Sequence, residues 1–207
     1  GAEMGAYATA MPGGAAPSPE SAAEFERVWG FPVPDHAGLT ASEMPEAAER
    51  GELDLLWMSG GNFFEALPDP ARVERSLERV PLRVHQDIVL TSQMLIPGDD
   101  VILLPVHTRY EQEGGGTETT TERRIAFSPQ IERQVGEARS EWRLFAEVAA
   151  RVKPELVSRF SWRDNQQLRG EIAEVVPAYA GIEELRETHD AVQWGGRHLC
   201  ADGVFPT

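Results

Sequence analysis

The residues best suited to chemistry lie where two short apolar runs end. Gly60-Gly61-Asn62 follows the run from Leu53 to Ser59, and Gln86-Asp87 follows the run from Leu82 to His85. Ligands of open α/β sheets bind outside the carboxyl ends of the strands. We therefore predict that the side chains of His85, Gln86 and Asp87 converge with that of Asn62 on one edge of a sheet.

Each of these groups suits a nucleotide. Two glycines let the backbone approach a phosphate or a ring with amide groups free to donate. The carboxylate of Asp87 could accept two hydrogen bonds from the N1 and N2 edge of guanine, and Gln86 could pair with another polar edge. The alternatives are a turn for Gly60, Gly61 and Gln86 and a helix cap or loop carboxylate for Asp87. A GxGxxG dinucleotide fingerprint is absent from the sequence.

Other chemistry-bearing residues form weaker patterns. Thr117 to Arg124 (TETTTERR) sets hydroxyls beside two arginines, which could hold a phosphate but also fit a solvated loop on an acidic surface. The histidines show no HExxH or paired ligand spacing; they are His36, His85, His107, His189 and His198. The single Cys200 excludes a disulfide framework, an all-cysteine zinc site and a self-contained iron-sulfur cluster within this sequence.

The composition limits the partners. The chain has 207 residues, with 19 Lys and Arg against 34 Asp and Glu, and a formal charge of -15. Such an acidic balance argues against duplex nucleic acid, whose phosphates need a basic face. No apolar run approaches the ~20 residues of a membrane span, so we expect no membrane contact. The lack of disulfide-forming cysteines is compatible with the cytoplasm, which is the predicted location.

The elements that must position these residues alternate between strands and helices. Strands are predicted at 53–59, 82–85, 101–104 and 124–127, and residues 111–121 as an exposed loop. Helices are predicted at 19–29, from Thr40 or preferably Ser42 to Gly51, after the Asp69 cap, within 91–97, after the Ser140 cap, from Asp164 to Pro177, and beyond Gly181. The predicted fold class is α/β, a Rossmann-like three-layer parallel sheet flanked by helices, with a helical or irregular C-terminal extension.

The chain is predicted to have three parts. Residues 1–52 form a loop-rich and helical lead-in, residues 53–153 an α/β cofactor-binding core, and residues 154–207 a helical extension. The tail from Gln193 to Thr207 has the glycines and proline of a linker. No Met opens the sequence. We therefore expect a piece of a longer protein.

Several stretches resemble one family, in the family's own order. They are "LDLLWMSGGNFFEALPDPARVERSLERVPLRVHQDIVLT", "DDVILLP" and "TTTERRIAFSPQIERQVGEARSEWRLFAEVA". This series is similar to the molybdopterin oxidoreductases of the dimethyl sulfoxide reductase superfamily. The opening "GAEMGAYATAMPGG", with "AEVVPAYAGIEEL" and "AVQWGG" near the end, most resembles formate dehydrogenase alpha subunits. The resemblance covers nearly the whole chain.

The resemblance implies a cofactor-binding fragment that is inactive alone. Family members bind molybdopterin guanine dinucleotide with molybdenum or tungsten. The missing N- and C-terminal domains of the same polypeptide would complete a site for a small-molecule substrate. In some members these missing parts also carry an iron-sulfur cluster. The matching positions near one dinucleotide are Gly60, Gly61, Asn62, Gln86, Asp87, Thr91, Glu113 and Gly114. No residue here matches a metal ligand or a catalytic group.

Two departures from the family pattern affect the loop from Pro105 to Arg123. The "DDVILLP" stretch is one residue longer than the usual acid-to-proline spacing, and "GGGTETTTERR" is rich in glycine. Two other functions stay open from the sequence. One is a stand-alone nucleotide-binding or regulatory module without redox activity, and the other is an acidic scaffold or subunit-interface protein.

Overall fold

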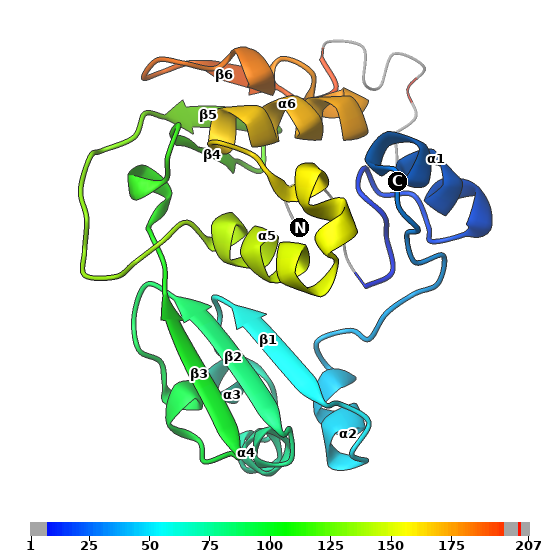
Figure 1. Cartoon of the computed structure of the whole chain (residues 1–207), viewed down its shortest axis with the longest axis vertical. Coiled ribbons are helices and arrows are strands. Elements are labelled where there is room, and N and C mark those ends of the chain that lie inside the picture. The colour runs from blue at the N-terminus through cyan, green and yellow to red at the C-terminus, as the bar shows by residue number, and fades with distance from the viewer. Residues whose placement is uncertain (1–7, 197–202, 204–207) are drawn as a thin grey trace. The chain divides into compact units, whose positions relative to one another are not determined.

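The computed structural model describes residues 8–196 and 203, and the chain forms two compact units (Figure 1). The parallel-sheet unit comprises Leu39–Thr108 and Gln134–Leu144. The antiparallel-sheet unit comprises Gly1–Gly38, Arg109–Arg133 and Phe145–Thr207. The predicted functional division of the chain at 53 and 153 stays a prediction.

The parallel-sheet unit confirms the first three predicted strands. Its elements are α2 (Met44–Glu49), β1 (Leu55–Ser59), α3 (Phe63–Ala66), α4 (Pro70–Glu78), β2 (Leu82–Asp87), the 3₁₀ helix η2 (Ser92–Leu95) and β3 (Asp100–Pro105). The strands are ordered β1-β2-β3, and both pairings are parallel. Met58, His85 and Leu103 lie side by side across the sheet, so the carboxyl ends of the strands share one edge.

Local capping explains where two of the helices begin. The Asp69 side chain accepts a hydrogen bond from the Arg72 amide (3.1 Å) at the start of α4, as predicted. At α2 the predicted cap is wrong, because Glu43 occupies the cap position instead of Ser42 or Thr40. The Glu43 carboxylate accepts from the Thr40 amide (2.8 Å) and hydroxyl (2.7 Å). This closed turn starts the helix one residue later.

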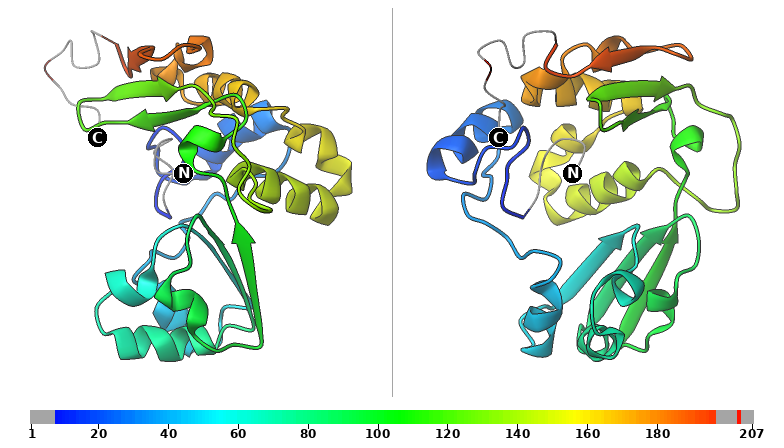
Figure 2. Two further views of the ribbon diagram at one scale, coloured as in Figure 1. Left: turned by 90° about the vertical axis from the view of Figure 1, so that its left-hand side faces the viewer. Right: turned by 180° about the vertical axis from the view of Figure 1, so that it is seen from behind.

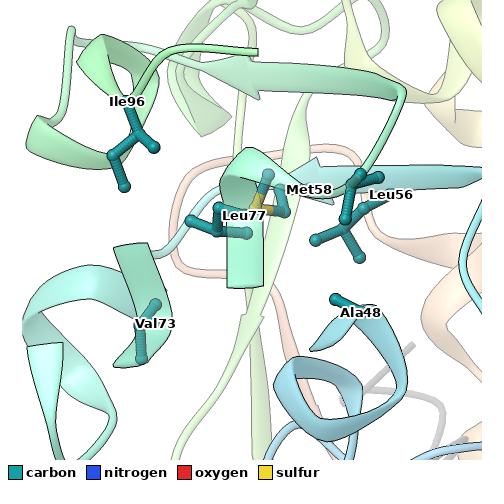
Figure 3. Close-up of a cluster of buried hydrophobic side chains, with 7 residues drawn as sticks. Ala48, Leu56, Met58, Val73, Leu77 and Ile96 are labelled. Carbon is teal, nitrogen blue, oxygen red and sulfur yellow. The ribbon is translucent and has the colours of Figure 1, made fainter. Parts of the chain in front are cut away.

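Helices cover one face of the parallel sheet. The core there consists of Ala48, Leu56, Met58, Val73, Leu77, Val80 and Ile96 (Figure 3). On the opposite face, Leu55 and Ile102 are 48% and 45% exposed. Two of the three predicted layers are therefore seen in this unit: the parallel sheet and, on one of its faces, the helices α2, α3 and α4 (Figure 2, left).

The antiparallel-sheet unit contains the fourth predicted strand as β5, but not in the predicted parallel sheet. Its elements are α1 (Pro19–Trp29), η3 (Arg109–Glu111), β4 (Gly116–Thr119), β5 (Arg124–Ser128), η4 (Pro154–Phe160), α6 (Asn165–Val175), η5 (Pro177–Tyr179), η6 (Ile182–Glu184) and β6 (Ala191–Gln193). Helix α5 (Glu141–Val152) begins in one unit and ends in the other. Strand β5 pairs antiparallel with both β4 and β6, so the fold is a mixed α/β arrangement with a second, small sheet.

The antiparallel pairing of β5 follows from the short connection between β4 and β5. A tight turn joins them, in which the Arg123 amide donates to the Thr120 carbonyl (3.1 Å). So short a connection can join only antiparallel strands, because a parallel pair needs a crossover of about a dozen residues. The predicted loop at 111–121 is therefore partly a strand. Its glycines are enclosed, since a Cβ on Gly115 would lie 2.5 Å from the Phe127 ring.

The predicted helices at the two ends of the chain are also present. Ser18 caps α1, and the Asp164 side chain accepts from the Gln167 amide (3.0 Å) at the start of α6. The short helix expected beyond Gly181 is η6. Within the described residues, no helix is long and apolar enough to cross a bilayer. His198, Cys200 and most of the predicted linker lie outside the described part of the chain.

Candidate functional site

The glycine turn after β1 is open. Gly60 and Gly61 have positive φ angles of 68° and 72°, a conformation that side chains with a Cβ rarely adopt. The Gly60 amide donates to the Gln86 carbonyl (2.8 Å), which anchors the turn to β2. A Cβ at either glycine would meet no atom within 4 Å. The turn therefore borders free space at the carboxyl edge of the sheet.

Gln93, a residue of η2, bonds to this turn through its side chain. No sequence pattern indicated this role. Its side chain is almost completely buried. Its amide group donates to the Gly61 carbonyl (2.8 Å), and its carbonyl group accepts from the Phe63 amide (2.8 Å). The Asn62 side chain adds a second link by donating to the Ser92 hydroxyl (2.9 Å), while its buried Oδ1 has no hydrogen-bond partner among the residues that the structure describes. These bonds hold the segment after Thr91 against the glycine turn.

The two polar residues at the end of β2 point to opposite faces. Successive side chains alternate across a sheet, so Asp87 shares a face with His85 and Gln86 does not. Gln86 is completely buried. Its Oε1 accepts from Trp57 Nε1 (2.5 Å), and its Nε2 donates to the Glu141 carbonyl (3.2 Å). Both polar ends of Gln86 are thus bonded within the protein.

A cavity of about 300 Å³ lies beside the carboxyl end of β2. Its lining is His85, Asp87, Ile88, Val89, Leu90, Met94, Leu103, Leu104 and Pro105. The walls are mostly apolar, with two polar side chains, which is the usual composition of a small-molecule site. Asp87 Oδ1 accepts from the Ile88 amide (2.7 Å), and this bond fixes the carboxylate where the loop leaves the strand.

His85 is the polar residue of this cavity to which the sequence pattern gave no role of its own. The residue is 1% exposed, and neither ring nitrogen has a hydrogen-bond partner in the described part of the chain. Burial lowers the pKa of His85 to about 4; the nearby Arg83 acts in the same direction and Asp87 opposes it. The imidazole is therefore neutral near pH 7, with one donor and one acceptor unsatisfied. Only its position two residues before Asp87 could have indicated this role.

The buried neutral imidazole predicts a pH dependence of stability. The pKa of His85 is about 4 in the folded chain against an ordinary value of 6.5. Between these pH values the unfolded chain binds a proton that the folded chain does not. The free energy of unfolding should therefore fall as the pH is lowered through this window, by up to about 1.4 kcal/mol per pH unit.

Urea unfolding between pH 4 and pH 7 would measure this slope, with His85→Leu as the comparison. The variant should lose this contribution and keep that of the carboxylates, because it removes the titrating group alone. The parent and the variant should differ most at the acid end of the range. Identical pH profiles for the two proteins would contradict a buried, neutral His85.

The last two predicted cofactor residues belong to the antiparallel-sheet unit. The Glu113 carbonyl accepts from the Asn165 amide (2.8 Å), and the Gly114 amide donates to Gln130 Oε1 (3.2 Å). Gly114 has a φ of 82°. It packs against the first residues of α6, where a Cβ on Gly114 would lie 3.1 Å from the Asp164 side chain. This turn is therefore tightly packed, unlike the turn at Gly60.

The arginine-rich stretch is also occupied by internal contacts. Arg123 donates to the Trp194 carbonyl and lies over the Trp194 ring, 5.5 Å from its centroid. Residues 117–119 belong to β4, where Glu118 pairs with Arg109. These contacts favour the structural interpretation of this stretch over a phosphate site.

Sequence comparison shows which proteins the chain is similar to. The sequence model of one family, described as molybdopterin oxidoreductase, matches residues 2–151. The chain belongs to this family. This confirms the resemblance seen in the sequence.

Several members of the molybdopterin oxidoreductase family can be aligned with the chain. A probable oxidoreductase, YjgC, of Bacillus subtilis is 30% identical over 83% of the chain and 16% of its own length. A nitrate reductase of Synechocystis is 29% identical over 84% of the chain and 24% of its own length. The F420-dependent formate dehydrogenase 1 subunit alpha of Methanococcus maripaludis is 29% identical over 99% of the chain and 29% of its own length. The chain thus spans less than a third of these relatives.

Proposed function

We propose that this chain is the part of a formate dehydrogenase-like molybdopterin oxidoreductase that holds the guanine end of a molybdopterin guanine dinucleotide. The observation that carries the proposal is the cavity at the end of β2, where one carboxylate, that of Asp87, faces mostly apolar walls. A purine ring is flat and largely apolar, and guanine presents two adjacent N–H groups that suit a carboxylate.

The surrounding residues fit this occupant. The turn at Gly60 and Gly61 borders open space, so a diphosphate could approach its backbone closely. The buried Oδ1 of Asn62 and the ring of His85 have no partner within the described structure, and a bound ligand could supply one. Gln86 has a different part in this proposal. Its bonds to Trp57 and Glu141 brace β1 and β2 behind the cavity.

The work of this segment is positioning. When bound, the pterin cofactor with molybdenum or tungsten supplies two-electron redox chemistry. Asp87 and the glycine turn would fix the far end of the dinucleotide and so the place of its reactive end. For Glu113 and Gly114, which belong to the antiparallel-sheet unit, a cofactor contact stays a prediction from the sequence. The remaining two thirds or more of the polypeptide would provide the substrate site, and any iron-sulfur cluster.

Calorimetric titration of the chain with GDP tests this function, with ADP as the control. We expect a GDP preference of at least about 10-fold, because adenine presents a bare N1 acceptor to Asp87 where guanine presents a donor. The absolute affinity should be low, in the millimolar to high micromolar range, since diphosphate and base are only part of the cofactor. Equal binding of GDP and ADP, or binding of neither, would count against the proposal.

A further inference from the structure

We propose that His85 is a specificity-determining residue, which donates a hydrogen bond to the O6 and N7 edge of the purine held by Asp87. The inference rests on the proposed function and goes beyond it, because it assigns recognition of the second polar edge of the base. Both residues belong to β2 (Figure 1). Their side chains line the same cavity.

The spacing along β2 fits the two edges of a purine. His85 and Asp87 are two residues apart on one strand, so their side chains share a face and start about 6.6 Å apart. Asp87 lies at the strand end, and His85 lies one step deeper. Guanine could therefore direct its N1 and N2 donors at the carboxylate while its O6 and N7 acceptors point toward the imidazole.

The state of the ring makes this donation favourable. A buried polar group without a partner is costly, and a ligand that supplies the partner recovers that cost on binding. His85 is neutral near pH 7, so the ring always has an N–H to donate. Among residues 8–196 neither ring nitrogen has a partner, so no hydrogen bond of that part of the chain fixes which one carries the hydrogen.

The two residues read different features of the base, which lets their contributions be separated. Inosine diphosphate lacks the 2-amino group that Asp87 would bind and keeps O6 and N7. The diphosphate of 2,6-diaminopurine riboside keeps the 2-amino group and N7, replaces O6 with an amino donor and turns N1 from a donor into an acceptor. Both residues should disfavour it, and the His85→Leu variant isolates the share that His85 contributes. His85 should therefore contribute to discrimination against the diaminopurine nucleotide and not against inosine diphosphate.

The test is calorimetry on the 207-residue chain with GDP, inosine diphosphate and the diaminopurine nucleotide. His85→Leu should weaken GDP binding about 3- to 10-fold, the effect of one hydrogen bond. The preference for GDP over the diaminopurine nucleotide should fall by a similar factor, and that for GDP over inosine diphosphate should not change. His107→Leu is the matched control, because His107 is also buried with both ring nitrogens unpartnered but does not line the cavity.

Each outcome decides between the two proposals. If Asp87→Ala loses GDP binding and His85→Leu binds all three nucleotides like the parent, the role of His85 is overturned and the guanine site stands. If the parent shows no guanine preference, the proposed function fails and the role of His85 fails with it. If His107→Leu loses as much affinity as His85→Leu, the loss reflects general destabilisation, and the role of His85 is overturned.

Discussion

Replacing Asp87 by alanine should weaken GDP binding by roughly 1.5 to 3 kcal/mol, which is about 10- to 150-fold. The carboxylate lines the cavity and is the acceptor suited to the guanine N1 and N2 donors. Alanine removes both hydrogen bonds and the charge that strengthens them. Calorimetric titration with GDP measures the loss directly. Unchanged affinity in the variant would remove Asp87 from the site.

Two further variants separate recognition from local folding. Asp87→Asn keeps an oxygen for the Ile88 amide, which Asp87 Oδ1 now binds at 2.7 Å. It should therefore weaken GDP binding less than alanine and reduce the preference for GDP over ADP. Asp100→Ala makes the same charge change at the start of β3, at the opposite edge of the sheet. GDP binding to that control should equal that of the parent.

Replacing Arg169 by alanine should destabilise the antiparallel-sheet unit by roughly 2 to 4 kcal/mol. The guanidinium is 4% exposed. It donates to the carbonyls of Gly114 (3.2 and 3.3 Å), Gly115 (3.3 Å) and Leu185 (3.4 Å). It also lies over the Phe127 ring, 4.8 Å from the centroid. Alanine would remove these bonds and take both guanidinium donors away from the Gly114 carbonyl. The carbonyls of Gly115 and Leu185 would keep the donors Asn165 and Arg186, each at 2.9 Å.

Burial of this charge carries a cost, which lowers the pKa of Arg169 to about 10, with Arg186 adding to the effect. Removing the guanidinium relieves part of that cost, so the net loss should lie below the sum of its bonds. Urea unfolding measures the net value, and amide exchange at Gly115 and Asn165 should report the loosened turn.

Arg151→Ala is the control, since the Arg151 side chain is 73% exposed and pairs only with Glu147 across one helical turn among the contacts described. It should change stability by less than about 0.5 kcal/mol. A similar value for Arg169→Ala would contradict the role assigned to that residue.

Local patterns were sufficient for the elements whose signals lie close together in the sequence. Ser18, Asp69 and Asp164 sit directly before their helices, and a cap acts within one turn of the chain. The three parallel strands were recognisable as short apolar runs between turn residues. The ordered series of such stretches also identified the molybdopterin oxidoreductase family.

The second sheet could not be predicted in the same way. The residue types of the strand Arg124–Ser128 predict a strand but do not indicate whether its neighbour runs parallel or antiparallel. The pairing depends on the turn from Thr120 to Arg123 and on the late strand Ala191–Gln193, which is distant in sequence. The pairing of β5 with Ala191–Gln193 joins segments far apart in the sequence, so no local pattern reveals it.

At the candidate site, the sequence by itself determined which residue types gather at the carboxyl edge of the sheet. The glycines after β1 and the acid at the end of β2 could be placed there from the strand lengths and the turn residues alone. Only the tertiary structure decided the part that each one plays. Gln86 and Asp87 are neighbours, yet the alternation of side chains sends one to Trp57 and the other into the cavity. His85 became a candidate only because the folded chain buries its ring beside Asp87 without a partner, and burial and bonding are properties of the packed chain.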